Sequence, residues 1–277
     1  MVSTVLLEHL IDDAALFPPG DAPMPLAVGL HRAAKLGPLS WLVGRFLCPA
    51  SRIDELAREL RPDDAIALGV VADTGVAGLP AALARIDADP RLTLLAVEIA
   101  VPGQPDLVSG VREVLAGLPD RVRCYLELPQ VSDWQAGLAV VAAARQGAKL
   151  RTGGSGAKDF PTDAAVAAFI VSCVAAGMPF KCTAGLHRAV RYTDRRTRAR
   201  HHGFLNITLA VCAAVRGDDP APVLAGRHKS RIAAAVHGID AETATRARAL
   251  FAGFGSCSIG EPAGDLLALR LLEGELA

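Results

Sequence analysis

The sequence lacks an excess of charge of either sign. Its 277 residues contain 29 lysines and arginines and 29 aspartates and glutamates, which gives a formal net charge of zero at pH 7. Such a chain has no overall positive field to attract nucleic acid or an anionic membrane surface. We therefore expect neither nucleic acid nor a membrane as a partner, and we expect any small anionic metabolite to be bound by a local group of cations.

The sequence also lacks the motifs of several common sites. Its six cysteines form no Cys-x-x-Cys pair, which argues against a zinc site or a disulfide framework. No G-x-G-x-x-G, Walker A or H-E-x-x-H pattern supports a nucleotide site or a zinc protease site. No uncharged apolar run reaches membrane-spanning length, and the acidic N-terminal segment is unlike a secretory signal. We expect a cytoplasmic protein with no resident cofactor and no metal ion.

Short apolar runs alternate with longer stretches of helical period along the chain. Apolar residues make up 51% of the sequence, enough to cover both faces of a parallel sheet. The runs predict strands at residues 14–18, 42–48, 65–72, 93–101, 123–128, 148–152, 180–183 and 254–259. Eight strands with helical crossovers predict an α/β protein, one (β/α)8 TIM barrel over residues 1–277. An open doubly wound sheet is the alternative, and the pattern leaves open whether the chain forms a homo-oligomer.

One connection departs from this alternation. Residues 186–203 are rich in arginine and histidine and are too polar for a buried helix. A solvated surface loop is one interpretation of this segment. Because the loops that follow barrel strands lie on the active face, the other interpretation is a basic lid over an anionic substrate.

Charged residues occur late in several of the predicted strands, where burial is costly unless the charge is paired or faces the barrel mouth. They are Arg45, Asp73, Glu98, Glu127, Lys149, Arg151 and Lys181. Because side chains alternate along a strand, Lys149 shares a face with Arg151. For the same reason Lys181 shares a face with Thr183. If these faces point inward, cations and carboxylates meet at one end of the barrel, either as a catalytic pocket or as a structural layer of ion pairs.

Lysine is rare in this chain, yet two of its five lysines are Lys149 and Lys181. Arginine supplies most of the positive charge, so lysine at two neighbouring strand ends indicates that a compact amine is needed there. An amine flanked by cations loses its proton more easily and can act as a base or as a Schiff-base nucleophile. We expect the pKa of one of these lysines to be lowered, although Glu98 and Glu127 would act in the opposite direction.

Glycines and hydroxyl residues follow the last three predicted strands. Glycine lets backbone N–H groups approach an anion, and the last two loops of a barrel commonly bind phosphate, although glycine is also common in tight turns. We expect an anion near Gly185 and Ser256, with help from Arg188 or Arg191. His187 is a candidate for proton transfer or anion contact. The complete set of candidate binding residues is Arg45, Asp73, Gly153, Gly154, Thr183, Gly185, His187, Ser256 and Ser258.

The segment Lys181-Cys182-Thr183-Ala184-Gly185-Leu186 resembles the seventh-strand motif of deoxyribose-phosphate aldolases. Gly255-Ser256-Cys257-Ser258 is similar to the strand-eight phosphate loop of that family, and the segment from Lys149 to Gly154 is similar to its strand-six motif. The resemblance covers roughly the second half of the chain. It implies a class I aldolase with Lys149 as the nucleophile, Lys181 lowering the pKa of that lysine, and the loops at Gly185 and Ser256 holding a phosphate.

The leading hypothesis is therefore a metal-independent lyase or isomerase that acts on a small phosphorylated or carboxylated carbonyl metabolite. Lys149 or Lys181 would supply the amine, Glu98 or Glu127 the acid and base, and Arg151 an anion clamp.

Two alternatives remain open. Asp73, Glu98 and Glu127 close three consecutive predicted strands, an arrangement similar to the magnesium-binding carboxylates of enolase-type barrels. Oxygen ligands suit magnesium, and the lysines would then act as bases. The remaining alternative is a catalytically silent barrel that binds a ligand or takes part in an assembly.

Overall fold

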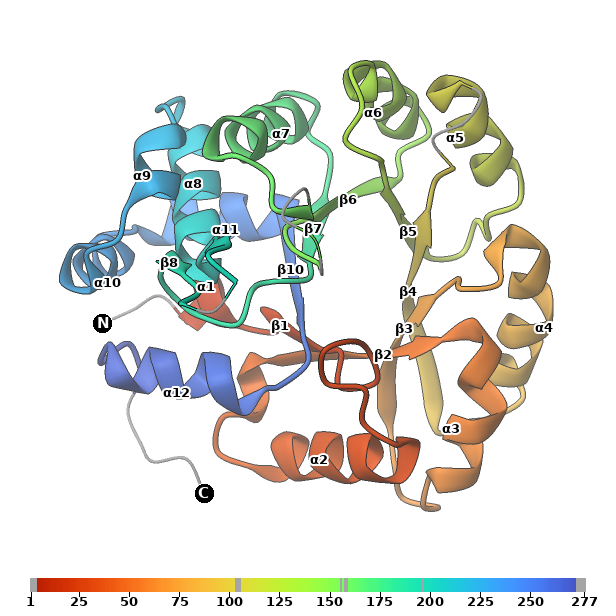
Figure 1. Ribbon diagram of the computed structural model, residues 1–277. Coiled ribbons are helices and arrows are strands. Elements are labelled where there is room, and N and C mark those ends of the chain that lie inside the picture. The colour runs from red at the N-terminus through yellow and green to blue at the C-terminus, as the bar shows by residue number, and fades with distance from the viewer. Residues whose placement is uncertain (1–3, 103–105, 155, 157–158, 196, 273–277) are drawn as a thin grey trace.

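The computed structural model describes residues 4–102, 106–154, 156, 159–195 and 197–272. Eight parallel strands close into a barrel in the order β1, β10, β7, β6, β5, β4, β3 and β2, and helices surround the ring (Figure 1). The strands are β1 (Ile11–Asp13), β2 (Val43–Pro49), β3 (Ile66–Val71), β4 (Leu92–Ala100), β5 (Arg123–Glu127), β6 (Gly147–Arg151), β7 (Phe180–Thr183) and β10 (Phe251–Ser256). The expected (β/α)8 TIM barrel is confirmed.

The outer layer consists of helices, of which α1 precedes the first strand and the others come after strands in the sequence. They are α1 (Thr4–Leu7), α2 (Met24–Leu36), α3 (Ile53–Glu59), α4 (Gly75–Asp87), α5 (Leu107–Ala116), α6 (Trp134–Ala143), α7 (Asp163–Ala175), α8 (Phe204–Arg216), α9 (Ala221–Ala225), α10 (Lys229–His237), α11 (Ala241–Leu250) and α12 (Gly260–Ala268), with 3-10 turns η1 (Ser40–Leu42) and η2 (Ala50–Arg52). Thr162 begins α7 by accepting a hydrogen bond from the backbone of Ala165. In the described part of the chain, no helix is both long and apolar enough to cross a membrane.

Successive strand residues point alternately to the helices and to the barrel interior. On β7 the ring of Phe180 packs outward against Phe169 of α7, with centroids 5.6 Å apart. The next residue, Lys181, points inward and is fully buried. Glycine makes room inside: a Cβ at Gly147 would lie 2.5 Å from the ring of Tyr125. The apolar core therefore lies between strands and helices, while the interior of the barrel carries charge.

The first strand differs from the expectation. It covers Ile11–Asp13, whereas the sequence predicts a strand at residues 14–18, which here form turns after β1. Two of its three residues are acidic, and because buried strands are usually apolar, the sequence does not indicate a strand here. Asp12 and Asp13 are nevertheless buried, because Asp12 pairs with cations inside the barrel and Asp13 binds His31 of α2 at 3.0 Å.

The last strand also lies earlier than expected, at Phe251–Ser256 instead of residues 254–259. It contains Gly253, whose φ of 131° and close approach to the carbonyl oxygen of Leu10 leave no room for a Cβ. Glycine inside a strand looks like a turn in the sequence. The close approach of β10 to the segment before β1 is what requires it.

The basic segment 186–203 is an ordered excursion between β7 and α8. It contains a two-stranded antiparallel hairpin, β8 (Tyr192–Thr193) and β9 (Arg200–His201). Its first residues pack inward, because Leu186, Ala189 and Val190 are buried. Residue 196 lies outside the described residues. The first part of the segment is therefore buried, whereas the arginines near the turn between β8 and β9 are exposed.

Candidate functional site

Seven charged side chains of alternating sign form one continuous group inside the barrel. In order they are Arg151, Glu127, Lys149, Glu98, Lys181, Asp12 and Arg45, and we call them the charged network. The Nζ atom of Lys149 lies 2.9 Å from Oε2 of Glu98 and 3.0 Å from Oε2 of Glu127. Arg151 donates from Nε to Oε1 of Glu127 at 2.6 Å. Lys181 donates to Oδ2 of Asp12 at 2.6 Å and also to Glu98.

Strand register brings the network together. Lys149 on β6 is the in-register neighbour of Glu127 on β5 and of Lys181 on β7, and these strands lie side by side in Figure 1. Glu98 comes from β4 and Asp12 from β1, so the ion pairs cross the interior of the barrel. The five residues expected to form the catalytic group therefore lie together: Glu98, Glu127, Lys149, Arg151 and Lys181.

The network opens toward the carboxyl ends of the strands. Arg151, Glu127 and Thr183 are the last residues of β6, β5 and β7. The exposed fraction of the side chain falls from 48% at Arg151 to 12% at Glu127, 7% at Lys149 and 0% at Lys181. A molecule that enters past Arg151 therefore meets the amine of Lys149 before that of Lys181.

The electrostatics of the network favour its charged form. Burial alone would raise the pKa of Glu98, Glu127 and Asp12, but the neighbouring cations outweigh it, and the pKa of each carboxyl lies below its usual value. Burial lowers the pKa of Lys149, whereas Glu98 and Glu127 raise it by more, so the net pKa is raised. For Lys149 the expected lowering of the pKa is wrong, because its nearest charged groups are carboxylates.

Asp12 is the member of the network that the sequence did not indicate. It is fully buried and accepts hydrogen bonds from both the backbone N and Nε of Arg45, at 2.8 and 3.0 Å. The guanidinium of Arg45 also lies over the ring of Tyr125, 5.5 Å from its centroid. An acidic pair directly after the apolar Leu10 and Ile11 is the signal that could have revealed it. Arg45 thus ends the network on the side opposite Arg151 in the series of ion pairs.

Asp73 does not join the other carboxylates. It is exposed at the end of β3, where it accepts hydrogen bonds from the backbone and hydroxyl of Ser51. Glu98 and Glu127 instead form ion pairs with lysines, Glu98 with Lys149 and Lys181 and Glu127 with Lys149. Among the described residues, no group of three or more histidines, cysteines and carboxylates is placed to hold a metal ion. The hypothesis of a magnesium site on Asp73, Glu98 and Glu127 is therefore wrong.

The loops after β6 and β7 lie against each other through glycine. A Cβ at Gly153 would be 2.8 Å from the Cα of Gly185, and Gly185 has a φ of 76°. The hydroxyl of Thr152 joins the same loops by donating to the carbonyl oxygen of Ala184 at 2.5 Å. Gly154 lies against the side chain of Asp159. These close contacts explain why glycine is needed at Gly153, Gly154 and Gly185. The expected phosphate at Gly185 stays a prediction.

The loop after β10 is held by its own hydrogen bonds. Ser256 is buried and donates to the carbonyl oxygen of Ser258 at 2.7 Å. Between them, Cys257 places its Sγ 3.7 Å from Nδ1 of His187, and Glu261 lies 3.7 Å from the same nitrogen. Burial lowers the pKa of His187, which keeps the imidazole neutral near pH 7. His187 therefore connects the last two loops and lies outside the charged network.

The two arginines expected to help bind an anion already have carboxylate partners. Arg191 is buried and pairs with Asp163 at the start of α7. Arg188 pairs with Asp265 of α12 at 3.2 Å. His201 is enclosed between rings, with centroids 4.6 Å from those of both Phe160 and Tyr192. The segment 186–203 is thus fastened to α7, α12 and the loop after β6.

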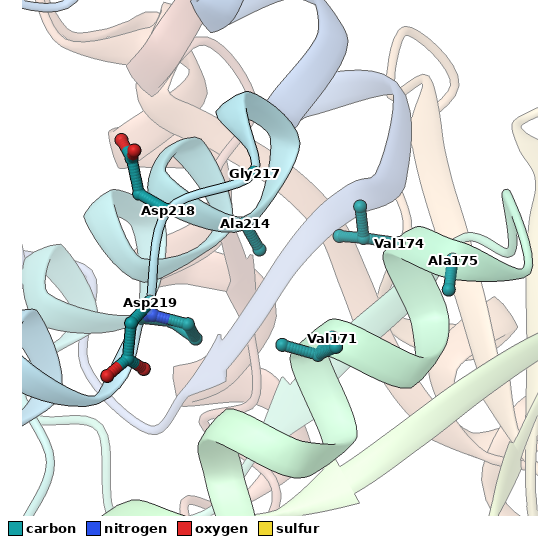
Figure 2. Close-up of a pocket in the computed structure, with 8 residues that line it drawn as sticks. Val171, Val174, Ala175, Ala214, Gly217, Asp218 and Asp219 are labelled. Atoms are coloured by element: carbon teal, nitrogen blue, oxygen red, sulfur yellow. The ribbon is translucent and has the colours of Figure 1, made fainter.

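A hollow of about 500 Å³ lies on the outer surface rather than in the barrel mouth. Val171, Val174 and Ala175 of α7 line one side, and the end of α8 with the following turn lines the other (Figure 2). The carboxylates of Asp218 and Asp219 point away from these aliphatic side chains. None of the lining residues belongs to the charged network, so the hollow lacks the groups that the expected chemistry needs. We place the candidate site at the network.

The fold and the network together define a (β/α)8 barrel with two lysines and three carboxylates in its interior. Comparison of the chain with models of protein families, with curated protein sequences and with solved structures finds no match. The function is therefore argued from the geometry of the site.

Proposed function

We propose that this barrel is an aldolase-type lyase or isomerase that binds a small carbonyl metabolite as a Schiff base on Lys149. The observation that carries the proposal is the in-register pair Lys149 and Lys181, which share the carboxylate of Glu98. A class I aldolase needs an amine nucleophile with acid and base groups within reach of it. The charged network contains both, and the resemblance to deoxyribose-phosphate aldolases points to the same two lysines.

Lys149 is the better nucleophile of the two because of its position. Its amine lies on the side of the opening, whereas Lys181 is fully buried between Asp12 and Glu98. Lys181 acts on the carboxylates: its charge helps to keep the pKa of Glu98 low, so that this group remains an anion beside the reacting amine. Lys181 is therefore a positioning residue and Lys149 the catalytic one.

Glu127 is the acid–base partner of the amine. Lys149 gives a proton to Glu127, whose Oε2 lies 3.0 Å from Nζ, and the neutral amine attacks the carbonyl carbon of the substrate. The proton held by Glu127 then passes to the hydroxyl of this adduct, which leaves as water. The protonated imine that remains draws electrons from the neighbouring carbon, so a C–C or C–H bond at that carbon breaks with its electron pair moving toward the imine nitrogen. Glu127, again a carboxylate, accepts the proton from that C–H bond, or from the hydroxyl of the fragment that leaves as a carbonyl compound when the C–C bond breaks.

Reductive trapping tests this proposal. The protein is incubated with acetaldehyde, pyruvate or dihydroxyacetone phosphate, reduced with borohydride, and analysed by intact mass and peptide mapping. We expect one adduct on Lys149 that is absent in Lys149→Arg and retained in the control Lys229→Arg, since Lys229 is exposed on α10. Because the pKa of Lys149 is raised, the trapping rate should still increase with pH up to and beyond about 10.4.

The competing account is a structural layer of ion pairs, which is favoured by the pairing of every charge in the network. It predicts no trapped adduct with any of the three compounds. Adducts spread evenly over Lys35, Lys149 and Lys229 would equally refute the proposal, because nonspecific reaction follows exposure. Under either result the Schiff base on Lys149 is refuted, and the structural layer of ion pairs remains.

A further inference from the structure

We propose that the carbonyl substrate is a 2-oxo acid, in which a carboxylate sits on the carbon next to the carbonyl, and that Arg151 binds this carboxylate. The inference rests on the proposed function and names the substrate class of the same site. It comes from the position of Arg151 relative to the amine, from the charge of the network and from the partners of the other arginines.

Arg151 lies close to the amine of Lys149. Nζ of Lys149 and Nε of Arg151 contact the two oxygens of the same carboxylate, that of Glu127, at 3.0 and 2.6 Å. The amine of Lys149 and the guanidinium of Arg151 are therefore bridged by a single carboxylate, that of Glu127. A substrate bonded to Nζ through its carbonyl carbon reaches Arg151 with a carboxylate on the adjacent carbon. A phosphate at the far end of a sugar chain extends beyond this distance.

Arg151 also retains hydrogen-bond donors for an anion. In the described part of the chain, the hydrogen bonds of this guanidinium involve Nε, and its partner is Glu127. The side chain ends β6 and is 48% exposed, so the guanidinium is accessible to an incoming molecule. Two parallel N–H groups of a guanidinium match the two oxygens of a carboxylate.

The charge of the network also favours a carboxylate. The network contains four cations and three carboxylates, and it therefore carries one net positive charge. A single carboxylate neutralises this charge, whereas a phosphate dianion would leave one negative charge in excess. Excess charge is costly next to Lys181 and Glu98, which are almost completely shielded from water.

The other arginines near the opening are less suited to an anion. Arg191 is buried against Asp163, and Arg188 pairs with Asp265, which also accepts a hydrogen bond from the backbone of Ala189. A phosphate bound by the buried Arg191 must first displace Asp163, and Arg188 lies against α12, outside the charged network. Arg151 can bind an anion without breaking its contact with Glu127.

The test uses three carbonyl compounds that differ in charge. Pyruvate carries the carboxylate, and methyl pyruvate has the same carbonyl group without it; dihydroxyacetone phosphate serves as the phosphorylated probe. The concentration for half-maximal borohydride trapping on Lys149 is measured for wild type, Arg151→Gln and the matched control Arg188→Gln. We expect Arg151→Gln to raise this concentration about tenfold or more further for pyruvate than for methyl pyruvate, because both probes share any effect on Glu127 and only pyruvate loses a carboxylate contact. Arg188→Gln should change neither value.

The possible failures are distinguishable. No adduct on Lys149 with any probe refutes the proposed function itself. An adduct on Lys149 that forms most readily with dihydroxyacetone phosphate keeps the proposed function and overturns the choice of a 2-oxo acid. An equal loss for pyruvate and methyl pyruvate in Arg151→Gln also overturns it, because Arg151 would then act only on Glu127. The thermal unfolding temperature of each variant verifies that it folds.

Discussion

Glu98 holds the ammonium groups of Lys149 and Lys181 at once, and it comes from a strand that pairs with neither of them. Each lysine has a second carboxylate, Glu127 for Lys149 and Asp12 for Lys181. A buried charge without a partner is far more costly than a buried pair. The network therefore depends on each residue being present, whatever chemistry it performs.

Replacement of Glu98 by glutamine tests this dependence. The change leaves two buried lysines with one carboxylate partner each, so we expect a loss of about 3–5 kcal/mol in the free energy of unfolding. The control Glu55→Gln breaks a partly exposed pair with Arg52 and should cost no more than about 1 kcal/mol. Urea unfolding at pH 7 measures both. Equal effects of the two substitutions would mean that the interior is well hydrated.

At the scale of the elements, the loops after β6 and β7 behave as one unit. The backbone of Gly153 meets that of Gly185, and the backbone N–H of Thr152 donates to the carbonyl oxygen of Thr183 at 2.8 Å. Both loops directly follow the strands that carry Lys149 and Lys181. Their close packing limits how far the two strand ends can move relative to each other.

Gly153→Ala should separate these loops, because the new Cβ would lie 2.8 Å from a backbone atom that cannot rotate away. We expect a loss of about 1–3 kcal/mol in the free energy of unfolding. Gly29→Ala is the matched control, since Gly29 is an exposed helical glycine of α2 with no atom within 4 Å of the added Cβ. It should stabilise the protein by up to about 1 kcal/mol. A mild effect at Gly153 would show that the loops are not in firm contact.

The elements also show which features the sequence could reveal. Strands such as β3 and β4 consist mostly of apolar residues on both faces. Such apolar runs are evident from the sequence alone. Charged residues late in these runs, such as Glu98 and Lys149, correctly indicated a group inside the barrel. β1 was missed because it is three residues long and mostly acidic. Its acidic residues are stabilised by partners far away in the sequence, such as Lys181, and no local pattern contains that information.

At the scale of the whole molecule, two sets of buried titratable groups occupy separate layers. The charged network lies inside the barrel, and five of the six cysteines are buried, on strands and on the helices around them. Burial raises the pKa of Cys48 and Cys124 to about 12 and that of Cys212 to about 11, and it also raises the pKa of Cys173 and Cys182. In the unfolded chain these thiols titrate near 8.5.

The buried thiols predict a loss of stability at alkaline pH. Because their pKa is raised by folding, the stabilisation associated with the thiol form is fully present below about pH 8.5 and is lost as the pH rises toward the folded values. Between these limits the unfolded chain releases protons that the folded protein retains. Each thiol then lowers the free energy of unfolding by up to about 1.4 kcal/mol per pH unit.

Urea unfolding between pH 7 and pH 10, under reducing conditions, measures this slope. Cys48→Ala should reduce the steepness of the decline above about pH 8.5, because one titrating thiol is removed. Val70→Ala is the matched control, since Val70 is the in-register neighbour of Cys48 on β3 and both side chains are fully buried. Both substitutions leave a small cavity and lower stability at pH 7, but Val70→Ala should keep the wild-type slope. An identical slope in Cys48→Ala and wild type would mean that this thiol titrates in the folded protein as it does in the unfolded chain, and that water reaches the layer between β2 and its helices.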